Sequence, residues 1–592
     1  DNQIVFASPS YSNLTLSGTG AKSTDASLTI RGNLVLTTGA TLKGGNYTHS
    51  VGGNWYNNTS ADAFEYDSST IVFNGSLAQE IGGTFGTSFS NFVMANSAGI
   101  NLMKPVQVFE SLTSSGTGSV LNTNDFLTIK SLQTRTAYVG NMAGNSINGK
   151  VSVERYISAR KAWRFISVPT LGTQTIKEAW QEGAVNESSN PSPGFGIQVT
   201  GTSSDWAAAG FDRQSPAPSI KYYNSTTNLW VGITNTNSTP ATNEKGYMVF
   251  VRGDRLSTEI YSPATQTNLR TKGELKQGTQ PVINVMPDKY ESIGNPYASP
   301  VDFTKISKGA SIQNAFYLWD PFLAGDYGLG GYQTYSAVND WKPLPGGTTS
   351  HPTGIPNTII QSGEAFFVHG ESSGSPTDFQ MHFDENAKVE ANPQTFSRNA
   401  VPDLRRRFLR ASLFNNSGTL LDGNAVVYDD KFSNDVDGND VQKLSMSGEN
   451  FGVSRSGRLL VIESRGNENI NDTIFYNLTG LKKQNYHFAF APDKMDINGK
   501  LFLIDNYLHT TTEISSQDTT WYNFNVNNEA LSSDEGRFFV VINNAEPKLS
   551  ARFESVNAFP DRGKVVVKWS ILNEKGAFQE YVIERRTADA TY

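Results

Sequence analysis

The chain of 592 residues contains no cysteine, and this absence excludes disulfide bonds, thiolate metal sites and a cysteine nucleophile. Charged side chains are few, at 18%, and the net charge is −8. An acidic balance provides no basic field to attract nucleic acid, so we expect no nucleic-acid partner. No apolar run approaches the roughly 20 residues that a membrane-spanning helix needs, so we expect a protein that does not span a membrane.

Helical periodicity is also scarce, since no long stretch repeats apolar residues at three- and four-residue spacing. The best candidate helix is short and covers Thr175 to Glu182. Glycine is abundant instead, with 53 residues, and short alternating segments separated by turn residues fill the chain. Length predicts roughly four domains of about 150 residues, and composition predicts an all-β fold.

Within a first domain expected at residues 1–150, the stretch from Tyr11 to Leu132 repeats apolar pairs two positions apart, separated by Gly, Asn, Ser and Thr. Each pair marks a very short strand, and Gly and Asn suit the sharp corners between strands. Such spacing favours a parallel β-solenoid, in which each coil buries its apolar face on the next coil. A β-sandwich is the structural alternative. The solenoid predicts that these side chains point inward: Leu34, Leu36, Ile71, Phe73, Ile100 and Leu102.

Residues 151–390 carry six of the nine tryptophans, which predicts a sizeable aromatic core in a jelly-roll-like β-sandwich. A polar, proline-containing linker is expected at 391–403. Residues 404–547 hold six apolar segments that we expect to form the antiparallel strands of a second β-sandwich. These segments are 407–414, 424–430, 458–464, 486–492, 500–506 and 537–543.

Residues 548–592 begin a further module with the strand-like sequences VVVKWSILNE and EYVIERR. About 40 residues cannot bury the core of a sandwich, so we expect the module to be incomplete within this sequence. The chain also begins DNQIVF, without Met or a signal peptide. We therefore expect an exported fragment of a longer protein that continues past Tyr592.

The aromatic region strings together motifs that carry turn chemistry and no catalytic chemistry. They are RYISARKAWRFISVPT (155–170), GYMVFVRGDR (246–255), ESIGNPYASPVDF (291–303), FYLWDPF (316–322) and SGEAFFVHG (362–370). In this order they resemble the large adhesin-like surface proteins of Bacteroidota that the type IX secretion system exports. The resemblance implies an extracellular location at the cell surface, and partnership with the secretion and surface-attachment machinery through a region beyond Tyr592. VVVKWSILNE and EYVIERR likewise resemble early strands of a fibronectin type III-like module.

An acidic loop is the strongest candidate metal site. Asp435, Asp437, Asn439 and Asp440 cluster beside Gly438. Ca²⁺ takes six to eight oxygen ligands on a bendable loop, and Gly438 supplies the bend. The spacing departs from an EF-hand because no Glu stands at the twelfth position, so a solvated acidic turn remains the alternative.

Two short sequences resemble the O-glycosylation acceptors of secreted Bacteroidota proteins. They are Asp472-Thr473-Ile474 and Asp518-Thr519-Thr520, which makes Thr473 and Thr519 candidate glycosylation sites. The tripeptide Arg252-Gly253-Asp254 follows an apolar strand, and a structural role is favoured over recognition by an integrin.

No motif nominates a catalytic centre, because the sequence has no HExxH, GxSxG or P-loop pattern. We therefore expect a non-enzymatic surface adhesin or stalk that binds glycans or other surfaces weakly and multivalently. Two alternatives stay open. One is a carbohydrate-active enzyme with appended β modules, and the other is a structural subunit of an extracellular filament or sheath.

Overall fold

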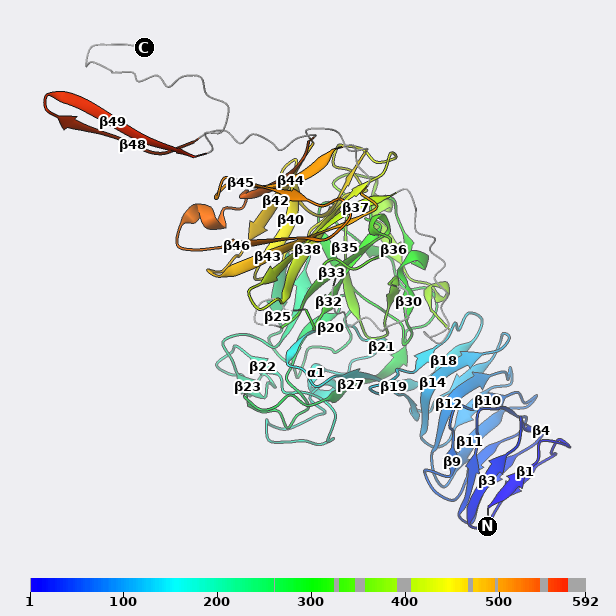
Figure 1. Cartoon of the computed structure of the whole chain (residues 1–592). Helices are drawn as coiled ribbons and strands as arrows, with labels where there is room; N and C mark the ends of the chain where they lie inside the picture. The colour runs from blue at the N-terminus through cyan, green and yellow to red at the C-terminus, as the bar shows by residue number, and fades with distance from the viewer. Residues whose placement is uncertain are drawn as a thin grey trace. The chain divides into compact units, whose positions relative to one another are not determined.

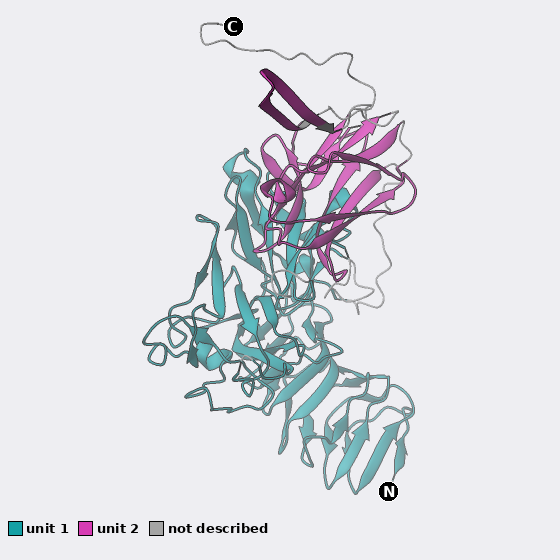
Figure 2. Ribbon diagram, turned by 60° about the vertical axis from the view of Figure 1, so that its left-hand side comes forward, with its two compact units in different colours: residues 1–402 teal, residues 403–592 magenta. Residues whose placement is uncertain are grey.

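The computed structural model describes residues 2–259, 261–323, 329–346, 357–390, 406–466, 472–495, 499–543 and 552–572. The fold is all-β, as predicted, and its chain contacts divide it into two compact units, residues 1–402 and 403–592 (Figure 2). The expected short helix is α1 (Ile176–Ala179), whose N-cap Thr175 accepts from the backbone of Glu178 in a capping box. No described helix is long and apolar enough to cross a membrane.

The first part of unit 1 is a parallel solenoid of stacked coils with three strand-bearing sides (Figure 1). Leu14 pairs with Leu34 and Leu34 pairs with Trp55, so these coils take 20 and 21 residues. One side contains β1 (Gln3–Val5), β3 (Gly20–Thr24), β6 (Ala40–Lys43) and β9 (Phe64–Glu65). A second contains β4 (Thr29–Ile30), β7 (Thr48–Val51), β10 (Thr70–Phe73), β12 (Thr87–Met94), β14 (Val106–Ser114), β16 (Leu127–Ile129) and β19 (Lys150–Ile157). The third contains β2 (Leu14–Leu16), β5 (Leu34–Leu36), β8 (Trp55–Asn57), β11 (Gln79–Gly83), β13 (Ile100–Leu102), β15 (Val120–Asn122) and β18 (Ser146–Asn148).

The solenoid prediction is confirmed, because neighbouring coils pair in parallel and not as two antiparallel sheets. The six side chains expected to point inward are all buried: Leu34, Leu36, Ile71, Phe73, Ile100 and Leu102. At the centre of the core, the Trp55 ring lies 5.0 Å from Phe64 and 5.2 Å from Phe89, centroid to centroid. The Trp55 indole also donates to the Thr87 hydroxyl at 3.2 Å.

Asparagine side chains satisfy the backbone at one corner of successive coils. The amide oxygen of Asn13 accepts from the backbone N–H of Asn33 at 2.7 Å, and that of Asn33 accepts from Asn54 at 2.8 Å. A Cβ on the adjacent Gly53 would lie 2.5 Å from the carbonyl carbon of Gly32, so the coils approach too closely there for any larger residue. These features explain the recurrent Gly and Asn between the apolar pairs.

The solenoid continues directly into the next part of unit 1. Strand β19 pairs in parallel with β16 and antiparallel with β27 (Thr267–Leu275), and Val151 and Leu275 belong to the same core. The Glu385 carboxylate accepts from the backbone N–H of Met142 at 2.8 Å and of Gly278 at 2.7 Å. The domain boundaries expected at 150 and 390 stay predictions, and the linker expected at 391–403 lies outside the described residues.

Two four-stranded sheets build the aromatic core that the tryptophan count predicts. One has the order β20 (Ala162–Ile166), β26 (Tyr247–Val251), β24 (Ile220–Asn224) and β25 (Leu229–Gly232). The other has the order β29 (Tyr290–Gly294), β35 (Ala365–His369), β32 (Ala315–Asp320) and β33 (Gly331–Ser336). Rings from the two sheets pack together, since Phe367 lies 5.1 Å from Phe165 and 4.8 Å from Tyr223.

Unit 2 contains a large sheet that includes all six predicted strand segments. Its main order is β45 (Thr510–Ile514), β44 (Lys500–Asp505), β47 (Phe538–Asn543), β42 (Thr473–Thr479), β40 (Asn450–Arg455), β41 (Arg458–Arg465), β38 (Leu420–Tyr428), β37 (Arg407–Asn415), β43 (Asn485–Asp493) and β46 (Thr520–Asn525). The expectation of wholly antiparallel strands is wrong, because β38 pairs with β41 in parallel. The intervening residues are long enough for the crossover that a parallel pair requires.

This sheet folds back on itself. Strands β43 and β47 are far apart in the strand order, yet the rings of Phe488 and Phe538 lie 4.9 Å apart. The ring of Phe524 on β46 lies 4.8 Å from that of Phe538 as well. A further hairpin, β48 (Arg552–Asp561) and β49 (Lys564–Leu572), pairs only with itself among the described residues.

We expect Phe89→Ala to destabilise the solenoid by about 3 to 5 kcal/mol, because it opens a cavity in the ring cluster around Trp55. Urea unfolding followed by circular dichroism measures the loss. The control is Leu77→Ala, since the Leu77 side chain is 78% exposed. Equal stability of the two variants would contradict a core built on these rings.

Candidate functional site

The acidic loop predicted to bind calcium forms a turn that its own side chains hold. Asp440 is buried, and its carboxylate accepts from the backbone N–H groups of Ser464 and Asp437, both at 2.8 Å. The Asp437 carboxylate accepts from the backbone N–H of Asn439, also at 2.8 Å. Burial raises the pKa of Asp440 to about 6, despite those hydrogen bonds. The structure thus brings together three of the four predicted residues.

Asp435 is the fourth predicted residue, and it is exposed. Among the described residues, no group of three or more His, Asp or Glu side chains lies close enough together to hold a metal ion. The turn geometry alone explains Asp437, Asn439 and Asp440 as structural residues. Calcium binding by this loop therefore stays a prediction.

Calcium binding predicts a higher melting temperature with calcium than with a chelator, because an ion that binds only the folded protein stabilises it by mass action. The shift should disappear in the Asp435→Asn/Asp437→Asn variant. Scanning calorimetry with calcium and with EDTA makes both comparisons. An identical melting temperature of the unsubstituted protein in the two solutions would show that the loop does not bind calcium.

The two candidate glycosylation sites lie in different environments. Thr473 is half-buried in β42, and its backbone N–H donates to the Asp472 carboxylate at 2.9 Å. Thr519 is exposed on the turn between β45 and β46. An enzyme can reach Thr519 more readily, and modification of either residue stays a prediction.

The Arg252-Gly253-Asp254 tripeptide is built into the fold. Asp254 is buried, and its carboxylate accepts from the Thr265 hydroxyl at 3.0 Å and from the backbone N–H of Leu256 at 3.2 Å. The next residue, Arg255, forms a fully buried ion pair with Asp212 at 2.8 Å. This environment matches the structural role favoured from the sequence.

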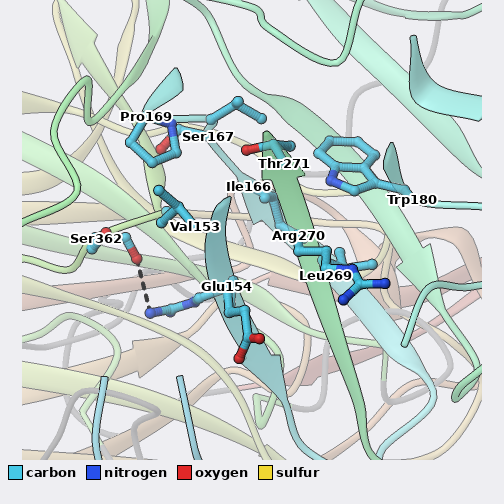
Figure 3. A pocket seen from close by; sticks show the side chains of 13 residues that line it. Val153, Glu154, Ile166, Ser167, Pro169, Trp180, Leu269, Arg270, Thr271 and Ser362 are labelled. Atoms are coloured by element: carbon cyan, nitrogen blue, oxygen red, sulfur yellow. Dashed lines mark hydrogen bonds between the residues drawn. The ribbon is translucent and has the colours of Figure 1, made fainter. Parts of the chain in front are cut away.

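A small cavity lies between β19, β20 and β27, close to Trp180 (Figure 3). Its volume of about 20 Å³ is room for roughly one water molecule, not for a sugar ring. Its polar groups already have partners, since Arg155 donates to the carbonyl of Ser362 at 2.9 Å and Arg270 pairs with Glu182 at 2.5 Å. This cavity is therefore a packing feature of the sheet junction.

An aromatic and cationic surface lies at one end of the sheet formed by β20, β26, β24 and β25. We call Trp163, Lys221, Phe250 and Arg252 the Trp163 surface. Trp163 pairs with Phe250 across the two strands, and their ring centroids are 5.3 Å apart. Both residues are half-buried. The neighbouring pair on the same face, Phe165 and Met248, continues into the buried aromatic core.

Each ring of this surface lies next to a cation. The Lys221 ammonium is 4.9 Å from the centroid of Trp163, and the Arg252 guanidinium carbon is 4.8 Å from the centroid of Phe250. Such contacts are attractive because the face of an aromatic ring is electron-rich. Burial lowers the pKa of Lys221 and of Arg252.

The sequence indicated the motifs that contain Trp163 and Phe250, but it did not predict that these two residues pair across strands. The two residues lie on strands that are far apart in the sequence, and Lys221 comes from a third strand, β24. The local signal was the two-residue spacing of Phe250, on β26, and Arg252, directly after that strand, because side chains two residues apart in extended chain share a face.

The fold and this surface define an all-β protein with a parallel solenoid and aromatic β modules. A family model for a domain of unknown function, DUF8693, matches residues 201–541, which is more than half of the chain. The chain therefore belongs to this family. No curated protein and no solved structure matches the chain.

Proposed function

We propose that this chain is a non-enzymatic adhesin or stalk protein, displayed outside the cell, that binds glycans. The observation that carries the proposal is the Trp163 surface, which places two half-buried aromatic rings side by side at one end of a sheet. Aromatic side chains with one face accessible are common at recognition surfaces. The motif resemblance supports export by the type IX secretion system and attachment through that machinery.

The architecture suits presentation of such a surface. Stacked coils that share one continuous core make a rigid support, because each coil contacts its neighbours along its whole length. We further propose that the aromatic part of unit 1 and the large sheet of unit 2 are β-sandwich modules. The ring contacts between Phe165 and Phe367 and between Phe488 and Phe538 support this proposal.

We also propose that the hairpin β48 and β49 begins a fibronectin type III-like module. A hairpin alone is marginally stable in water. Val556 pairs with Trp569, Pro560 pairs with Val565, and all four side chains are accessible. Such a face would be covered in a complete module, which supports the proposal.

Binding to an array of oligosaccharides tests the function. We expect the whole chain to bind a subset of the array and Trp163→Ala to lose that binding, because the substitution removes the central ring of the surface. The matched control is Trp521→Ala, which removes a tryptophan that is 60% exposed on unit 2. Circular dichroism checks that both variants keep the fold.

Two outcomes would contradict the proposal. The first is binding of no saccharide by the unsubstituted protein. The second is release of reducing ends from the bound saccharides, since an adhesin leaves its ligand intact and a carbohydrate-active enzyme does not.

A further inference from the structure

The two cations of the Trp163 surface lack an anionic partner in the part of the chain that the structure describes. Among the described residues, no carboxylate forms an ion pair with Lys221 or Arg252, and no acceptor bonds to either charged group. Arg213 of the same unit, by contrast, pairs with Glu187 at 3.0 Å and with Glu259 at 3.0 Å.

Arg252 also has unmet hydrogen-bonding capacity. Its Nη1 atom is shielded from water and has no acceptor among the described residues. Buried polar groups in folded proteins usually have hydrogen-bond partners, and an orphaned donor on a charged group is costly. An arginine fork beside an aromatic ring is well suited to an oxyanion, because its N–H groups match the geometry of carboxylate, sulfate and phosphate.

The net negative charge of the chain strengthens the case that these two cations bind an anion. The sequence carries 56 acidic and 48 basic side chains, so an uncompensated positive pair cannot be ascribed to a generally basic surface. Both cations are partly desolvated by the rings they contact, and partial burial strengthens their attraction to an anion.

We propose that the Trp163 surface binds an acidic saccharide, with Lys221 and Arg252 pairing with its carboxylate or sulfate group and Trp163 and Phe250 contacting its ring. This inference rests on the proposed function and names the class of glycan. A neutral saccharide would leave both cations unpaired. A simple inorganic anion would leave the two rings without a contact.

Isothermal titration calorimetry with matched saccharides tests the inference. Oligogalacturonate is compared with its methyl ester, which keeps the sugar rings and removes the charges. Dextran sulfate is compared with dextran in the same way, so the two arms distinguish a carboxylate from a sulfate. We expect at least one charged member of the two pairs to bind roughly tenfold or more tightly than its neutral counterpart. That preference should shrink as salt concentration rises.

The decisive variant is Lys221→Met/Arg252→Gln, which keeps long side chains beside the rings and removes both charges. We expect it to lose the preference for the charged saccharide while it keeps its melting temperature. The matched control, Lys272→Met, removes one charge from an exposed lysine on β27 and should bind as the unsubstituted protein does.

The other outcomes distinguish failure of this inference from failure of the proposed function. Equal binding of charged and neutral saccharides, or unchanged binding by Lys221→Met/Arg252→Gln, overturns the inference and leaves glycan binding in place. Polyglutamate could also bind as tightly as the charged saccharides and lose that binding in the same variant. This result would overturn the inference, because it would show that the occupant need not be a saccharide. Binding of no saccharide by any form of the protein overturns the inference and the proposed function together.

Discussion

Lateral hydrogen bonding between neighbouring strands is the interaction on which every part of this protein depends. The chain has no cysteine to cross-link its loops, and a single coil of the solenoid cannot cover its own apolar side chains. Each strand therefore becomes stable only when the next strand pairs with it. The antiparallel pairing of β19 with β27 carries this arrangement past the last coil and into the aromatic part of unit 1.

Buried arginines solve a related problem where loops enter the interior. Arg255 pairs with Asp212 and also donates to the carbonyl groups of Asn186, Ser189 and Ile197. In unit 2, Arg537 pairs with Asp505 and donates to the carbonyl groups of Asn525 and Ser532. In both cases a planar group with five donors satisfies carbonyls of loops or of a strand end, and an aspartate compensates its charge.

The fold could be predicted from the sequence where side-chain spacing alone decides burial. Pairs such as Leu34 and Leu36 place two side chains on one face, and Gly and Asn mark the corners between short strands. Polar strands escaped prediction, since β45 has the sequence TTTEI and β46 has the sequence TWYNFN. The parallel pairing of β38 with β41 escaped too, because strand direction depends on how the chain crosses between them.

In the candidate site, too, contacts between residues close in sequence could be predicted, whereas contacts between distant strands could not. The two-residue spacing at the end of β26 predicts that Phe250 and Arg252 share a face. It cannot predict that β20 brings Trp163 opposite Phe250, because pairing partners and register are set by the whole sheet. The acidic loop illustrates the converse, since its composition suits a cation while its geometry directs Asp437 and Asp440 to backbone amides of the loop and of Ser464.

The pairing of β20 with β26 and of β19 with β27 bears on where this family's domain should be delimited. The family match begins at residue 201, whereas β19, β20 and β21 (Thr170–Leu171) all precede it. A fragment cut at residues 201 and 541 would deprive β27 of both its neighbours and leave β26 with one open edge. The segment matched by the family model is thus shorter than the segment whose strands are hydrogen-bonded to one another. Expression boundaries for relatives should therefore be set upstream of the strand equivalent to β19.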